Sequence, residues 1–330
     1  MKTSLRTIGL AGVVLLSACD GSGGPIELKF GHVGAPGSLF ALSAEEFARR
    51  VNEELGERVH VSVFGSSQLG GDEVMMQKLK LGTLDFSLPS TIMSSVVPEF
   101  GLFEMPYLIA SRDHMRAVEQ EIVWPRLAPL APARGYTLLA VWENGFRHVT
   151  NNVRPIVTPD DLRGIKLRTP RGVWRVKLFQ TFGANPAPMP LSEVFVALQT
   201  GVIDGQENPF AQIWASRLQE VQQYLSLTRH VYTPAFVAVG TARWNRLPED
   251  LRDDITRIAR ETQTFVYETA ARLDRELLGR LEESGLEVNT PDYDAFRAAS
   301  RPVYEEFGRA VEDGADLIAA ATALRPGDGG

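Results

Sequence analysis

The stretch that most suggests chemistry runs from Gly164 to Pro209. Within it, the alternating run 165–168 predicts a strand that ends on Arg168 and is soon followed by a proline. Ligands of open α/β sheets bind beyond the carboxyl ends of the strands, and a guanidinium there offers a planar fork that fits a carboxylate. Arg168 therefore either faces an anionic ligand in a small-molecule clamp or makes a structural ion pair, and the spacing alone leaves both interpretations open.

Several other side chains could complete such a site. Arg147, at the end of Asn144-Gly145-Phe146-Arg147, could supply a second donor or brace a hinge. Asn208 is expected on a polar turn after Gly205, where its amide can both donate and accept hydrogen bonds. Three aromatic residues could line the pocket or belong to the core: Trp174, Trp214 and Phe210.

The sequence carries none of the common catalytic signatures. It has no Gly-rich phosphate loop followed by Lys-Ser/Thr, no His-Glu-x-x-His helix and no Gly-x-Ser-x-Gly elbow. Its five histidines show no metal-ligand spacing. Acidic pairs such as Asp160-Asp161 fall at helix starts or on helix surfaces, where a solvated structural role suffices. We therefore expect a binding protein with no catalytic residue, no cofactor and no metal ion.

The composition is that of a folded, acidic protein. Of its 330 residues, 44% are hydrophobic and 23% are charged, and the formal net charge is -7. The length is enough for two lobes. An acidic surface argues against nucleic acid as a partner, so an anionic ligand must be captured by local positive charge.

The N-terminus predicts export. Lys2 and Arg6 precede an apolar run, 8–16, that is too short to span a membrane. The following Leu16-Ser17-Ala18-Cys19 resembles a bacterial lipobox, in which Cys19, the only cysteine of the chain, would be acylated. The alternative is a plain signal peptide that happens to contain a cysteine. We expect a periplasmic, extracytoplasmic protein that a lipid on Cys19 tethers to the inner membrane.

The remaining chain alternates strands and helices twice. This pattern predicts an α/β fold of two lobes, each with a parallel sheet and helices on both faces. In the first lobe we expect three strands with two helices between them: 27–33, 38–54, 59–64, 73–82 and 84–88. A turn at 143–145 should separate two further strands and begin the crossing into the second lobe, where 202–204 is expected to be extended.

The longest predicted helix runs from Leu247 to about Gly285. It would be roughly 55 Å long if unbroken, which exceeds one lobe, so it should span both. The expected organisation is a lipoprotein signal peptide at 1–18, a linker at 19–26, lobe I at 27–144 plus 234–273, lobe II at 145–233 plus 274–320, and a tail at 321–330.

An ordered set of short motifs adds a resemblance that covers about residues 27 to 312. The motifs are Phe30-Gly31-His32, Ser66-Ser67-Gln68-Leu69-Gly70-Gly71, Gly82-Thr83-Leu84-Asp85, Met105-Pro106-Tyr107, Asn144-Gly145-Phe146-Arg147, Lys166-Leu167-Arg168-Thr169-Pro170, Ser192-Glu193-Val194, Ala197-Leu198-Gln199 and Asp204-Gly205-Gln206-Glu207-Asn208-Pro209. Each is weak alone, but together they resemble the extracytoplasmic solute-binding proteins of TRAP transporters, the DctP type. The resemblance implies a two-lobe α/β fold of the periplasmic-binding-protein type, with mixed or parallel sheets and a long helix that bridges both lobes. It also implies that the lobes close around an organic acid and deliver it to a sodium-driven membrane permease.

The resemblance also implies roles for particular residues. The family's carboxylate-binding arginine falls on Arg168, a second arginine on Arg147 and a pocket asparagine on Asn208. Further contacts are expected near His32 and at Asp72.

One departure from the family bears on the ligand. Ser90 stands where sialic-acid members carry an acid, so sialic acid is disfavoured, whereas dicarboxylates, sugar acids, hydroxy or keto acids and aromatic acids remain open. Two rival functions are a secreted enzyme that acts on a carboxylate in the same cleft and a membrane-tethered sensor subunit that presents its closed form to a receptor.

Overall fold

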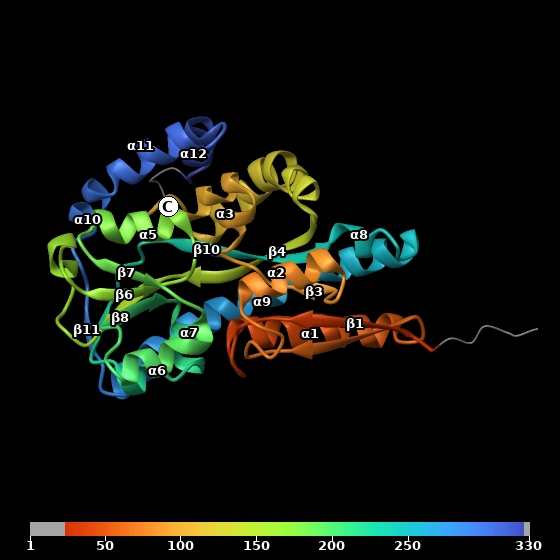
Figure 1. Ribbon diagram of the computed structural model, residues 1–330, viewed down its shortest axis with the longest axis horizontal. Helices are drawn as coiled ribbons and strands as arrows, with labels where there is room; N and C mark the ends of the chain where they lie inside the picture. The colour runs from red at the N-terminus through yellow and green to blue at the C-terminus, as the bar shows by residue number, and fades with distance from the viewer. Residues whose placement is uncertain (1–23, 327–330) are drawn as a thin grey trace, which may run out of the picture.

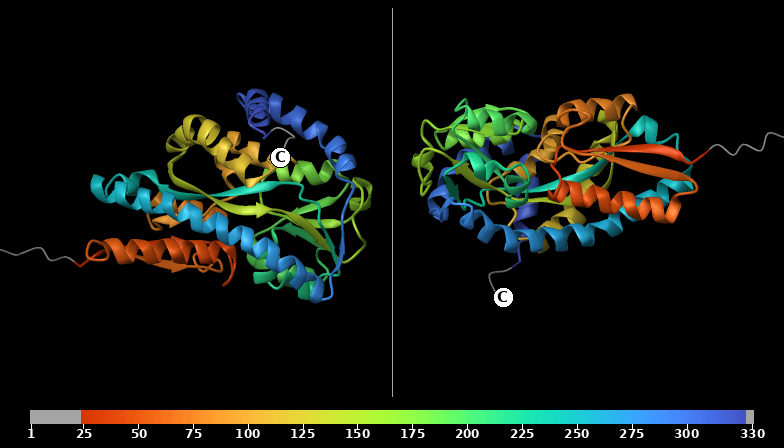
Figure 2. Two further views of the ribbon diagram at one scale, coloured as in Figure 1. Left: turned by 180° about the vertical axis from the view of Figure 1, so that it is seen from behind. Right: turned by 90° about the horizontal axis from the view of Figure 1, so that it is seen from below.

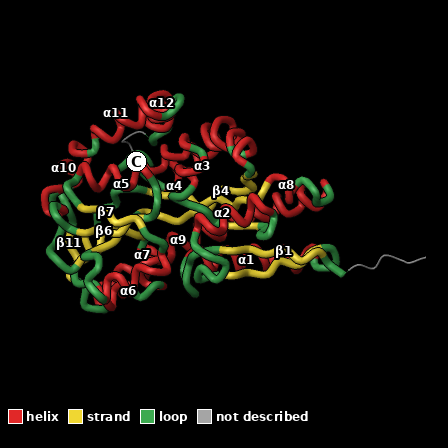
Figure 3. The backbone as a smooth tube through the Cα atoms, in the orientation of Figure 1, coloured by secondary structure: helices red, strands yellow, loops and turns green. Residues whose placement is uncertain are grey.

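Two β-sheets, one in each of two lobes, organise the molecule (Figures 1 and 3). The computed structural model describes residues 24–326. The expected signal peptide, Cys19 and most of the expected linker lie outside the described residues. The α/β two-lobe fold predicted from the alternation of strands and helices is confirmed.

The sheet of lobe I has five strands in the order β2-β1-β3-β10-β4. Its first three strands pair in parallel, while β10 pairs antiparallel with both β3 and β4. The strands are β1 (Ile26–Gly31), β2 (Val59–Phe64), β3 (Phe86–Ser87), β4 (Tyr136–Phe146) and β10 (Tyr232–Gly240). Aromatic side chains fill the core between this sheet and its helices, where Phe30 stacks on Trp142 with ring centroids 6.2 Å apart.

The sheet of lobe II has six strands in the order β11-β9-β5-β8-β6-β7. It is also mixed, because β5 runs antiparallel to both of its neighbours. The strands are β5 (His148–Asn151), β6 (Lys166–Thr169), β7 (Asn185–Pro188), β8 (Gly205–Asn208), β9 (Tyr224–Ser226) and β11 (Glu287–Asn289).

Helices cover the sheets. Those before the long helix are α1 (Leu39–Leu55), α2 (Asp72–Leu81), α3 (Met93–Val96), α4 (Arg112–Val118), α5 (Val173–Thr181), α6 (Val194–Gln199), α7 (Phe210–Ala215) and α8 (Thr241–Trp244). The short helix η1 (Pro98–Glu104) lies in a buried segment, and η2 (Glu119–Leu127) follows α4.

The long helix α9 (Glu249–Glu283) spans both lobes, as predicted. Its 35 residues extend roughly 50 Å, and Figure 2 shows it running along most of the molecule. It packs against β4 and α1 of lobe I and against α7 of lobe II. The indole Nε1 of Trp142 donates to the carbonyl oxygen of Ala259 at 2.9 Å, which fixes the helix to the sheet of lobe I.

The predicted turn at 143–145 is wrong, because β4 continues to Phe146. The pairing register of β4 with β10 shifts by one residue here: Gly145 faces Thr233, Glu143 faces Pro234, and Asn144 is the extra residue between them. The glycine, with φ +118, permits this β-bulge. The crossing into lobe II therefore comes after Phe146, and the return strand β10 begins in lobe I at Tyr232.

The C-terminal helices bridge the lobes. They are α10 (Tyr293–Ala299), α11 (Arg301–Ala310) and α12 (Gly314–Ala323). Helix α11 packs on α5 of lobe II, whereas α12 packs on η1 and η2 of lobe I, although 274–320 was expected to belong to lobe II. Helix α12 also extends three residues into the expected tail, and the carbonyl oxygen of Ala321 lies 2.7 Å from Nε2 of His114.

A substitution of Gly240 tests the packing of α2 on the sheet of lobe I. A Cβ at this position would overlap the backbone carbonyl of Leu79, which cannot move without displacing the helix. We expect Gly240→Ala to lower the free energy of unfolding by about 1–3 kcal/mol in urea denaturation. The matched control is Gly279→Ala in α9, where no atom lies within 4 Å of the added methyl group and helix propensity should raise stability slightly. Equal effects of the two substitutions would contradict this packing.

Candidate functional site

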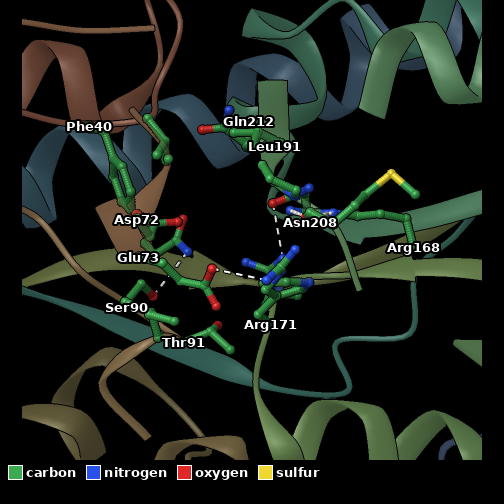
Figure 4. A pocket seen from close by; sticks show the side chains of 18 of the residues that line it. Phe40, Asp72, Glu73, Ser90, Thr91, Arg168, Arg171, Leu191, Asn208 and Gln212 are labelled. Carbon is green, nitrogen blue, oxygen red and sulfur yellow. Dashed lines mark hydrogen bonds and ion pairs between the residues drawn. The ribbon is translucent and has the colours of Figure 1, made fainter. Parts of the chain in front are cut away.

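A cleft between the lobes brings the candidate residues together (Figure 4). It encloses about 800 Å³, part of which is open to solvent. Lobe I contributes Val33, Phe40, Gly71, Asp72, Glu73, Val74, Ser90, Thr91, Ile92 and Asn144; lobe II contributes Arg168, Pro170, Arg171, Met189, Pro190, Leu191, Asn208 and Gln212; and Arg147 lies at the crossing. Concave sites of this size between lobes hold small molecules.

Arg168 enters the cleft from the end region of β6, as the strand prediction required. Its side chain is buried, with 3% of the residue exposed. Nε and Nη2 donate to the carbonyl oxygen of Met189 at 3.0 and 2.6 Å, and within the described part of the chain Nη1 makes no hydrogen bond and no carboxylate lies within 4.0 Å of the guanidinium. Burial lowers the pKa of Arg168 to about 10, so the group is still charged at neutral pH. Between residues 24 and 326, Arg168 thus makes no structural ion pair.

Arg147 is held by an acidic partner. Its Nε donates to Oε2 of Glu207 at 2.5 Å, and its Nη2 donates to the backbone oxygen of Glu207 at 2.6 Å and to Oδ1 of Asn208 at 3.0 Å. Arg147 lies between β4 and β5, so these bonds brace the crossing between the lobes. Its Nη1 makes no hydrogen bond to any described residue, which leaves one edge of the guanidinium for the cleft.

A buried ionic cluster lies behind these residues. Glu207 accepts from Arg175 at 2.6 Å, and Arg175 also lies 2.9 Å from Glu104 on η1 of lobe I. Burial alone would raise the pKa of Glu207, but the guanidinium groups of Arg147 and Arg175 outweigh it and hold this pKa well below its usual range. Burial lowers the pKa of His230, 3.0 Å from Glu207, to about 4, so this histidine is neutral. The cluster ties β8, α5, η1 and the crossing segments together.

Asn208 lies at the end of β8 and not on a turn. Gly205 to Asn208 is a buried strand that pairs with β5 and β6, and its polar side chains are satisfied by one another and by neighbours. Asn208 accepts from Arg147 and donates through Nδ2 to Oε1 of Gln206 at 2.6 Å. The polar sequence led to the prediction of a turn, because the ionic partners that permit such a strand come from distant segments.

Lobe I supplies polar groups to the opposite wall. Asp72 is the first residue of α2, directly after the cap residue Gly71, and burial raises its pKa to about 6. Ser90 donates to the carbonyl oxygen of Pro234 at 2.7 Å and accepts from Nδ2 of Asn144 at 3.2 Å. Asn144, the extra residue of the β-bulge, is thus one of the residues that line the cleft.

The three aromatic candidates lie outside the cleft lining. Trp174 packs edge-on against Phe307, with ring centroids 5.1 Å apart. Phe210 stacks on His148 at 4.2 Å, and the guanidinium carbon of Arg280 lies 4.6 Å from the ring centre of Trp214. Of the two interpretations that the sequence left open for these residues, packing is the one that their contacts support.

His32 also lies outside the cleft lining. It follows β1 as a residue with 1% exposure, and a Cβ on Gly65 would lie 2.8 Å from its ring. Burial lowers the pKa of His32 to about 4, and its Nδ1 has no hydrogen-bond partner in the described chain. Its neighbour Val33 is the residue of this segment that reaches the cleft.

Sequence reasoning missed a pair of charged residues. Nη1 of Arg171, in the loop after β6, donates to Oε2 of Glu73 on α2 at 3.0 Å, so the pair joins the two lobes across the cleft (Figure 4). Both residues are neighbours of positions that the sequence did indicate, Pro170 and Asp72. Their proximity in space was not readable from the sequence.

Residues 24–326 contain no group of three or more His, Cys, Asp or Glu residues that could hold a metal ion. No helix in that range combines the length and the apolar character needed to cross a membrane.

Comparison with known proteins decides the family. The family of bacterial extracellular solute-binding proteins, family 7 (DctP), matches residues 30–310. The chain belongs to this family. The resemblance found in the sequence motifs is thereby confirmed. Family 7 proteins are extracytoplasmic, in agreement with the export predicted from the N-terminus, and they are solute-binding proteins of transporters, so the interpretation as an enzyme is not supported.

Three relatives illustrate the similarity. The 2,3-diketo-L-gulonate-binding periplasmic protein YiaO of Escherichia coli (strain K12) is 32% identical over 89% of this chain and 90% of its own length. The sialic acid-binding periplasmic protein SiaP of Vibrio cholerae is 31% identical over 93% and 95%. A TRAP periplasmic solute-binding protein from Polaromonas sp. JS666, solved bound to D-erythronate, has a TM-score of 0.87 and 34% identity, covering 91% of this chain and 99% of that chain.

A substitution of Glu207 tests how much the buried ionic cluster contributes to the stability of this family 7 protein. We expect Glu207→Gln to lower the free energy of unfolding by about 3–5 kcal/mol at neutral pH, because Arg147 and Arg175 remain buried without their shared anion. The pKa of Glu207 is lowered by folding, so its contribution is present above the unfolded value of 4.5 and declines as the pH falls below it. The difference from wild type should therefore shrink between about pH 5 and about pH 3.

The measurement is urea unfolding at several pH values. The control is Glu276→Gln, which breaks the exposed pair between Arg272 and Glu276 on α9 and should have little effect. A Glu207→Gln protein as stable as this control would show that the cluster does not stabilise the fold.

Proposed function

We propose that the protein captures a small organic acid in the cleft between its lobes and delivers it to a TRAP permease in the membrane. The observation that carries this proposal is Arg168, a buried guanidinium that faces the cleft without an acidic partner in the described chain. A buried charge is costly unless it is paired, and a ligand carboxylate supplies the missing anion.

The groups around Arg168 suit the rest of such a ligand. Arg147 offers a free edge, Asn208 and Asn144 carry amides, and Ser90 carries a hydroxyl group. Apolar contacts with Phe40 and other residues would cover the carbon skeleton. The names of the relatives, which specify a diketo sugar acid, sialic acid and D-erythronate, support a carboxylate as the common feature. Ser90 still disfavours sialic acid as the ligand of this protein.

Closure of the lobes is the proposed mechanism. The lobes already touch beside the cleft: a Cβ on Gly71 of lobe I would lie 3.6 Å from Cβ of Pro190, and one on Gly172 of lobe II would lie 3.0 Å from Cγ2 of Thr91. A ligand that contacts both walls in this arrangement binds it better than an open one. Binding therefore shifts the population towards the closed form, which the permease would receive.

The anchoring role of Arg168 predicts a large effect of its removal. We expect Arg168→Ala to weaken ligand binding at least about 30-fold, because truncating one partner of a buried charge pair costs roughly 2–5 kcal/mol. Arg168→Lys should lose part of the affinity, because it keeps the charge and loses the planar fork. The ligand would be found by a thermal-shift screen of organic acids on the signal-free protein, starting with D-erythronate, and measured by calorimetry.

The control for Arg168→Ala is Arg163→Ala, which removes an arginine that is 76% exposed and lies outside the cleft lining. It should bind like wild type. A loss of less than threefold for Arg168→Ala would refute the anchoring role.

Attachment to the membrane through acylated Cys19 is a further part of the proposal. It rests on the lipobox-like Leu16-Ser17-Ala18-Cys19, which lies outside the described residues. In cells, Cys19→Ser should abolish labelling by a palmitate analogue and move the protein from the membrane fraction to the soluble periplasm. A wild-type protein that is unlabelled and soluble in the periplasm would support the plain signal peptide instead.

A further inference from the structure

The charged groups that line the cleft nearly cancel in pairs. They are three arginines and two acids: Arg147, Arg168, Arg171, Asp72 and Glu73. Arg147 is neutralised from behind by Glu207, and Arg171 is neutralised by Glu73. Within the described chain, Arg168 is then the lining arginine that has no carboxylate partner within 4.0 Å. Likewise, Asp72 is the lining acid that has no arginine, lysine or histidine partner within 4.0 Å.

The two walls of the cleft consequently differ in charge. Lobe II presents the unpaired guanidinium of Arg168, whereas lobe I presents Asp72 and Glu73 side by side at the start of α2. The first carboxylate of a ligand would pair with Arg168, the lining arginine that no carboxylate of the described chain neutralises. A second carboxylate on the same ligand would meet Asp72 and Glu73, and like charges in contact at a binding site are strongly repulsive.

Glu73 affects the charge of the cleft in two ways, because it carries a negative charge itself and also pairs with the guanidinium of Arg171. Arg171 follows Arg168 by three residues and lines the same cleft, so without Glu73 it would offer a second guanidinium to a ligand. The pair is about half exposed, with side-chain exposures of 52% for Arg171 and 47% for Glu73. Such a pair contributes little to stability, which allows it to be altered without unfolding the protein.

We infer that the Glu73–Arg171 pair is a specificity determinant that makes the cleft select monocarboxylates and reject the corresponding dicarboxylates. This inference rests on the proposed function, since it assumes that Arg168 holds the ligand carboxylate. It narrows the ligand to an acid with a single carboxylate whose far end carries neutral groups. Hydroxyl groups suit that end, because Asp72 can accept hydrogen bonds from them.

The experiment compares matched acids on the signal-free protein by calorimetry near pH 7.5. Each pair differs by oxidation of the far carbon to a second carboxylate: D-erythronate with meso-tartrate, and D-gluconate with D-glucarate. Wild type should bind the monocarboxylate of a pair at least about tenfold more tightly. Glu73→Gln removes one negative charge and frees Arg171, so it should strengthen dicarboxylate binding and reduce the preference at least fivefold.

Two further variants separate this role from a structural one. Glu276→Gln breaks the pair with Arg272, whose side-chain exposures of 49% and 50% match those of the Glu73–Arg171 pair, and it should leave the preference unchanged. Arg171→Gln leaves Glu73 unpaired, so it should weaken dicarboxylate binding further, opposite to Glu73→Gln. If a substitution only loosened the cleft in general, the affinities for the monocarboxylate and for the dicarboxylate would change in the same direction.

The outcomes are distinguishable from failure of the proposed function. Equal binding of both members of a pair by wild type, or equal preferences in Glu73→Gln and Glu276→Gln, would overturn the inference while leaving Arg168 as the anchor. If no acid binds, or if Arg168→Ala binds as wild type does, the proposed function fails and the inference with it.

Discussion

A buried guanidinium needs negative charge nearby, and this requirement governs the site. Arg168 is 97% buried, yet its hydrogen bonds within the described chain go to one backbone carbonyl. Folding therefore places a cation in a low-dielectric cleft, and in the proposed function a ligand carboxylate compensates its charge. The neighbouring arginines are compensated within the protein. Arg147 and Arg175 share the carboxylate of Glu207 and hold the crossing between the lobes, whereas Arg168 has no carboxylate partner in the described chain.

The scaffold explains how this charge is kept in place. Strands β6 and β8 carry Arg168 and Asn208 from lobe II, and the bulged segment of β4 carries Asn144 on the wall of lobe I. Helix α9 and the C-terminal helices contact both lobes and thereby join them outside the crossing segments.

The fold was largely predictable from local patterns, whereas the polar contacts were not. Strand and helix alternation gave the two lobes, helical periodicity gave α9, and the arginine at the end of a predicted strand gave Arg168. Asn208 was placed on a turn and Gly145 in a reversal because the partners that make β8 and the β4 bulge stable lie far away in sequence. For the same reason the sequence could not decide whether Trp174 and Trp214 belong to the pocket or to the core. The Glu73–Arg171 pair was missed because it joins residues that are 98 positions apart in sequence.

The most direct test of the account is a crystal structure of the protein with an organic acid that raises its melting temperature. The account predicts a ligand carboxylate within hydrogen-bond distance of the Arg168 guanidinium, with both walls of the cleft in contact with the ligand. A carboxylate bound elsewhere, while Arg168 contacts only the carbonyl of Met189, would contradict it.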